Sequence, residues 1–234
     1  MRETVIIEGR FRGPPSSANG GYACGVLGVR LGGPAEVTLR QPPPLDTPLE
    51  LEVEPGRVRL LGATGLIGEA LPASVDLEAP PPPSPDEAAA ATAAFAYFDQ
   101  HAFPTCFVCG PERARGDGLR IFPGRVAGRD LAAAPWRIDP SLTRDDDHVR
   151  PEIVWAALDC PSFFGFASLN DFRGEALLGR LTARVDELPR AGDDCLVAGW
   201  PIDAQGRKFR CGSALWTAGG RLLAVATSTW IRPR

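Results

Sequence analysis

The chain has 234 residues, of which 44% are hydrophobic and 23% are charged. These fractions lie close to those of globular proteins, so they exclude wholesale disorder. The formal net charge of −4 at pH 7 gives no sign of a basic binding surface, and we expect no nucleic-acid partner.

The cysteines and the N-terminal residues favour a reduced, cytoplasmic protein. A chain of this length does not need disulfides, and most of the six cysteines lie in apolar runs, as buried free thiols do. Residues 1–8 contain no long apolar core of a signal peptide. No stretch approaches the roughly 18 apolar residues that cross a membrane, so we expect no membrane span.

Residues 1–78 predict one unit in which a helix is followed by antiparallel strands. A β segment over residues 4–12 precedes a helix of small residues from Asn19 to about Arg30. Runs that alternate with a period of two or are rich in β-formers come next. These predicted strands are residues 36–40, 48–53, 57–63 and 66–71.

Residues 79–100 predict a linker and a connecting helix. Pro80 to Pro83 is a proline run that must be extended and stiff. Ser84 and Glu87 have the spacing of a capping box, with Pro85 at the first helical position. We expect the helix to continue to about Gln100.

Residues 101–234 repeat the order of the first unit. An apolar helix is expected from about Pro151 to Ala167, after two β segments and before four more. A unit that occurs twice in this way predicts a tandem duplication. The predicted strands are residues 119–126, 131–138, 177–185, 195–201, 208–217 and 221–230.

Two motifs carry a resemblance to a known superfamily. Cys106-Phe107-Val108-Cys109-Gly110, followed by Gly118-Leu119, resembles the entry segment of hot-dog thioesterase-like proteins. Asn19-Gly20-Gly21 resembles the His-Gly-Gly turn of the same superfamily. Together the two units resemble the double hot-dog acyl-CoA thioesterases. The resemblance implies an α+β fold, in which each unit wraps an antiparallel sheet around a central helix, and chemistry on an acyl thioester without a cofactor.

The start of the first helix is a candidate oxyanion hole. Asn19 is a good N-cap, and Gly20 and Gly21 leave the first turn without side chains. The N–H groups there have no intrahelical partner and lie at the positive end of the helix dipole, so a carbonyl oxygen could approach them closely. Close packing of the helix against a neighbouring element is the alternative explanation for the glycines.

The resemblance also implies a carboxylate seven residues after the second glycine. In the first unit that position is Gly28, which cannot serve; in the second unit, with Glu152 aligned to Gly21, it is Asp159. The resemblance therefore implies one composite site, in which Gly20 and Gly21 face Asp159 across the two units. At the mirror position Glu152 would repel an oxyanion.

Asp159 lies in a helix that is apolar nearly all round, which predicts burial and a raised pKa. Such a carboxyl can act as a general base for water or as a nucleophile. The alternatives are an aspartate paired with an arginine, or one that caps a helix break at Pro161. The neighbouring aromatic Phe164 would help to line an acyl tunnel. The residues expected to contact the substrate are Asn19, Trp155, Ser162 and Phe163.

The pair Cys106 and Cys109 leaves two interpretations. The pair could form a zinc cluster with His101 and one distant ligand, or a tight turn with packed thiols. We expect the turn and no metal, because a zinc site generally uses two such pairs.

Two functions remain from different classes. The first is an acyl-CoA thioesterase-like hydrolase whose partner is acyl-CoA or another acyl thioester; the second is a non-catalytic acyl-CoA- or lipid-binding protein. A hydratase fits poorly, because neither His101 nor His148 lies on a predicted active-site helix.

We also expect a homodimer of double hot-dogs. The candidate phosphate contacts are Arg120, Arg125, Arg180 and Arg184.

Overall fold

The computed structural model describes residues 1–233, and its first part contains one central helix and five strands. The predicted strand over residues 4–12 is shorter than expected, because the chain turns into a 3-10 helix at Gly9–Phe11. The elements are β1 Arg2–Ile6, α1 Gly20–Gly28, a 3-10 turn Val29–Leu31, β2 Ala35–Leu39, β3 Pro48–Glu54, β4 Arg57–Gly62 and β5 Gly65–Pro72.

The connecting helix, α2 Pro85–Ala93, begins as predicted and ends early. The capping box forms: Ser84 Oγ accepts the Glu87 N–H, and a Glu87 carboxylate oxygen accepts the Ser84 N–H. The helix does not reach Gln100. After Ala93 the chain leaves the helical path and buries Phe95 and Tyr97, which both contact the ring of Phe164.

The second part contains the long central helix and six strands. The predicted strand over residues 119–126 is mostly absent, because Arg120 adopts a positive φ of 54° and the N–H of Leu119 is donated to the Phe107 carbonyl of the preceding loop. The elements are β6 Gly124–Arg125, β7 Ala132–Arg137, a 3-10 turn Pro140–Leu142, α3 Pro151–Leu169, β8 Leu177–Val185, β9 Asp194–Gln205, β10 Lys208–Thr217 and β11 Leu222–Ile231.

All eleven strands form one antiparallel sheet in the order β1-β3-β4-β5-β2-β8-β11-β10-β9-β7-β6. The two parts meet where β2 pairs with β8, with Ala35 opposite Ala183 and Thr38 opposite Arg180. Outward from that pair, the strands of both parts follow the same order, apart from the short β6 at one edge. The α+β fold class and the repeated unit are confirmed.

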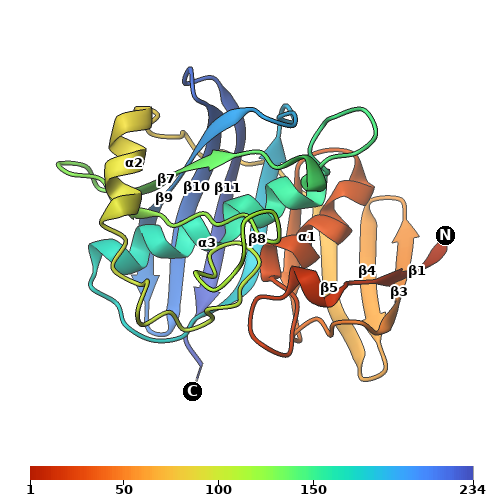
Figure 1. The fold of residues 1–234 in the computed structure, drawn as a ribbon. Helices are drawn as coiled ribbons and strands as arrows, with labels where there is room; N and C mark the ends of the chain where they lie inside the picture. The colour runs from red at the N-terminus through yellow and green to blue at the C-terminus, as the bar shows by residue number, and fades with distance from the viewer. Residues whose placement is uncertain (234) are drawn as a thin grey trace.

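Both central helices lie on one face of the sheet and pack against each other (Figure 1). Glycines on α1 allow this close approach. A Cβ on Gly25 would lie 2.6 Å from the Glu152 Cα, and one on Gly21 would lie 2.4 Å from the Asp159 Cβ. Close packing therefore accounts for part of the glycine content of α1, as the alternative explanation proposed. None of the helices in residues 1–233 combines the length and the apolarity that crossing a bilayer requires.

We predict that Gly25→Ala destabilises the fold although alanine is the better helix former. The added methyl would meet backbone and side-chain atoms of α3 at under 3 Å, and such overpacking costs about 1–3 kcal/mol. Chemical denaturation measures the free energy of unfolding. Gly33→Ala is the matched control, because a Cβ there meets nothing within 4 Å and should leave stability unchanged. Equal stability of the two variants would show that the helices do not need the glycine.

Candidate active site

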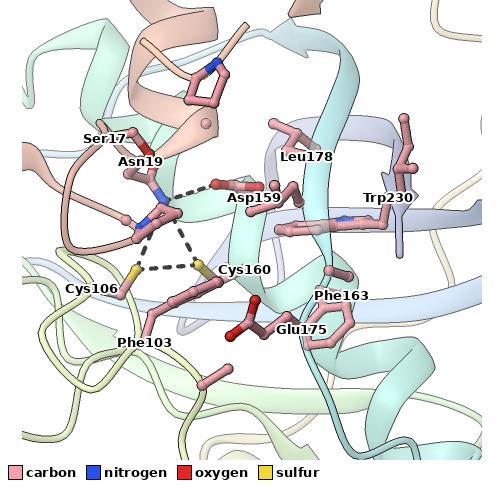
Figure 2. Close-up of a pocket in the computed structure, with 18 of the residues that line it drawn as sticks. Ser17, Asn19, Phe103, Cys106, Asp159, Cys160, Phe163, Glu175, Leu178 and Trp230 are labelled. Atoms are coloured by element: carbon pink, nitrogen blue, oxygen red, sulfur yellow. Dashed lines mark hydrogen bonds between the residues drawn. The ribbon is translucent and has the colours of Figure 1, made fainter. Parts of the chain in front are cut away.

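A cavity of about 550 Å³ lies where the two parts of the chain meet. The first part contributes Asn19 and Gly20 at the start of α1. The second part contributes Asp159 from α3, and the wall also includes Phe163 and Trp230 (Figure 2). The cavity is therefore composite, and most of its wall is apolar.

The carboxylate of Asp159 is buried against the N-terminus of α1. Its Oδ2 accepts the Gly21 N–H at 2.9 Å and the Asn19 side-chain amide at 2.8 Å. Its Oδ1 is buried and has no hydrogen-bond partner among the described residues. Asn19 also caps α1, since its Oδ1 accepts the Tyr22 N–H at 2.9 Å. The structure thus brings together the acid of the second unit and the glycine turn of the first.

Burial raises the pKa of Asp159 to about 7, and the hydrogen bond from Gly21 offsets part of that rise. A carboxyl of this kind exchanges a proton with water near neutral pH. Neither alternative that the sequence left open, an ion pair with an arginine or a cap at a helix break, describes Asp159. Asp159 forms no ion pair with an arginine of the described chain, and α3 continues through Pro161 to Leu169 without a break.

The first turn of α1 has one N–H group left for a ligand. The Gly21 N–H is donated to Asp159 and the Tyr22 N–H to Asn19. Gly20 stands at the first helical position, where no intrahelical acceptor exists, and it lines the cavity. The expected pair of glycine donors thus divides into one that holds the acid and one on a residue that lines the cavity.

Ser162 lies next to Trp230 and is fully buried. Its hydroxyl donates to the Asp159 carbonyl at 2.6 Å and accepts from the Trp230 indole N–H at 2.8 Å. It also accepts from the Ser228 hydroxyl at 2.7 Å. Ser162 therefore fixes Trp230, a wall residue, and is not itself among the residues lining the cavity.

The mirror position between the helices has a smaller hollow and no acid. A second hollow of about 220 Å³ is lined by Gly28, Pro151 and Trp155. The Trp155 indole covers Gly28, whose Cβ would lie 2.6 Å from the ring. Trp155, expected at the acyl tunnel, therefore packs on α1 instead, while Phe163 and Phe164 line the main cavity. Because this position is a glycine, the mirror site has no carboxylate, and Asp159 is the acid of the main cavity alone.

Three thiols lie close together beside Asp159, and the sequence did not predict this cluster. The sulfurs of Cys106, Cys109 and Cys160 all lie within 4.8 Å of one another. Asn19 Nδ2 reaches two of them, Cys106 at 3.9 Å and Cys160 at 3.8 Å (Figure 2). The only signal for Cys160 in the sequence was its position next to Asp159.

Other residues of the cavity wall were also not predicted from the sequence. His101 lines the cavity, and its buried Nε2 has no partner among the described residues; burial lowers its pKa. Arg40 and Arg173 are exposed where they border the cavity.

None of the four arginines expected to bind phosphate borders the cavity. Arg120 donates to the Pro111 and Arg113 carbonyls, Arg180 pairs with Glu36, and Arg184 pairs with Asp186.

Comparison with solved structures decides the fold. A tesB protein from Mycobacterium avium subsp. paratuberculosis superposes with a TM-score of 0.65 at 13% identity, over 100% of this chain and 93% of that chain. The chain has a double hot-dog fold.

Two further structures agree. A conserved protein with a hot-dog fold from Alicyclobacillus acidocaldarius matches with a TM-score of 0.62 at 12% identity, over 100% and 93% of the two chains. The acyl-CoA thioesterase II TesB2 from Mycobacterium marinum matches with a TM-score of 0.56 at 13% identity, over 86% and 80%. No protein-family model matches the sequence, and no curated protein does. At these identities the likeness concerns the double hot-dog architecture.

We predict that Ser162→Ala destabilises the protein by about 1–3 kcal/mol, because the Trp230 N–H and the Ser228 hydroxyl lose a buried acceptor. The free energy of unfolding measures the loss. Ser228→Ala should cost less, since Ser162 keeps its bond from Trp230. The reverse order would contradict the role of Ser162 as the central acceptor.

Proposed function

We propose that the composite cavity hydrolyses an acyl thioester, with acyl-CoA as the substrate class. One observation carries the proposal: a buried aspartate of one unit is held at the helix N-terminus of the other, with its second oxygen unpartnered beside an apolar cavity. The likeness to the architecture of TesB2, which is an acyl-CoA thioesterase II, supports the same class of reaction.

The substrate would lie with its acyl chain against Phe163, Phe164 and Trp230. The Gly20 N–H would donate to the thioester carbonyl oxygen, which becomes negative as the carbonyl carbon is attacked. The missing side chain of Gly20 makes room for Leu178, since a Cβ there would lie 2.8 Å from the Leu178 Cβ. Arg40 and Arg173 border the cavity and are exposed, as contacts to a phosphorylated carrier would need to be.

Asp159 would supply the base. Its Oδ2 is held by Gly21 and Asn19, so Oδ1 is the oxygen left to accept a proton from water. The resulting hydroxide adds to the carbonyl carbon, and collapse of the tetrahedral intermediate breaks the carbon–sulfur bond. The proton on Asp159 then passes to the leaving thiolate, which gives a free acid and a thiol.

We predict that Asp159→Asn lowers the rate of thiol release from a panel of acyl-CoAs by about 10²- to 10⁴-fold, the usual loss when a general base is removed. Glu152→Gln is the matched control. Glu152 lies on the same helix at the mirror position, next to Gly25 and away from the main cavity, so hydrolysis should persist.

Equal loss in both variants would contradict the assignment of the acid to one side. No release by the wild type, together with saturable acyl-CoA binding, would favour the acyl-CoA-binding protein over the hydrolase.

We further predict that Asn19→Ser and Asn19→Ala separate the two roles of Asn19. Serine is a good N-cap, so Asn19→Ser should keep the stability of α1, whereas Asn19→Ala should lose about 1 kcal/mol. Both variants lack the amide that holds Asp159, so both should lower kcat. Unfolding curves and steady-state kinetics give the two readouts. Full activity in Asn19→Ser would remove Asn19 from the positioning of Asp159.

A further inference from the structure

The three thiols beside the cavity come from two separate elements. Cys106 and Cys109 belong to the loop that precedes β6, and Cys160 belongs to α3. All three are buried, and all three line the cavity. The sulfurs of Cys106 and Cys160 are 3.7 Å apart. In a tetrahedral zinc–thiolate site with bonds of about 2.3 Å, neighbouring sulfurs are separated by ~3.8 Å.

The loop that carries Cys106 and Cys109 is a tight turn. The Gly110 N–H closes the turn on the Cys106 carbonyl at 2.9 Å. A Cβ on Gly110 would lie 2.5 Å from two carbonyl oxygens, so only glycine fits the turn. A Cys-x-x-Cys-Gly turn of this form keeps two sulfurs on one side of the backbone.

Asn19 supplies a hydrogen-bond donor near two of these sulfurs. Its amide nitrogen lies 3.9 Å from Cys106 Sγ and 3.8 Å from Cys160 Sγ. Donors of this kind stabilise the negative charge of ligating thiolates from outside the coordination sphere.

We propose that Cys106, Cys109 and Cys160 bind a zinc ion, which joins the entry loop of the second unit to α3 next to Asp159. Three thiolates are a donor set that selects a soft or borderline ion such as Zn²⁺. No fourth histidine, cysteine or carboxylate joins the cluster within the described residues. The fourth ligand would therefore be a water or a thiol that enters from the cavity, as in zinc sites with one open position.

The first experiment measures metal in the full chain, independently of any hydrolysis. Protein purified without chelators should contain about one zinc ion per chain. After removal of zinc, titration with Co²⁺ should produce thiolate-to-cobalt charge-transfer absorption and the intense visible bands of a tetrahedral site. Zinc should abolish both signals when it displaces the cobalt.

Variants assign the ligands. Cys160→Ser should lose the bound zinc and the charge-transfer absorption. Cys195→Ser is the control, because Cys195 is also buried but lies at the start of β9 and outside the cluster, so it should keep both. If Cys160→Ser does not fold, the cobalt spectrum of the wild type still decides the question.

Three results would overturn the proposal. They are wild-type protein without zinc and without a cobalt spectrum, stoichiometric copper in place of zinc, and a dithiothreitol-sensitive disulfide between Cys106 and Cys160. Because none of these readouts depends on turnover, the zinc site and the hydrolase can fail separately.

Discussion

The close contact between α1 and α3 is the constraint on which the site depends. Asp159 reaches the Gly21 N–H because no side chain stands between the two helices there; a Cβ on Gly21 would overlap the Asp159 Cβ. The same glycine therefore allows the helices to pack and leaves its N–H exposed to the acid. The oxyanion and packing explanations for this residue describe two consequences of one geometry.

The duplicated fold leads to an asymmetric molecule. The sheet repeats the same strand order on both sides of the β2–β8 pair, and the two central helices pack against each other. What differs is the facing residue. Asp159 meets the start of α1, whereas Gly28, at the corresponding position in α1, is covered by the Trp155 indole. The side chains thus provide an acid at only one of the two positions.

Much of the fold followed from local patterns, since alternation over residues 177–185 and 208–217 predicted β8 and β10 to the residue. The errors have local causes as well. The apolar run at residues 119–126 looks like a strand, but Arg120 adopts a positive φ and the loop backbone accepts the Leu119 N–H. Residue spacing and the family resemblance predicted that Asp159 lies near the glycine turn. No periodicity could place Cys160 beside Cys106, because that contact depends on how a loop folds over α3.

Asn19 links these features, and its environment explains why an amide suits the position. Its oxygen caps α1, one side of its amide donates to Asp159, and the same nitrogen lies near two sulfurs. A histidine, as in the turn that this segment resembles, could not accept from the helix and donate to carboxylate and sulfur with the same geometry. The thiols and the acid therefore share one donor. Through Asn19, the cluster and the carboxylate form one connected polar network in a wall that is mostly apolar.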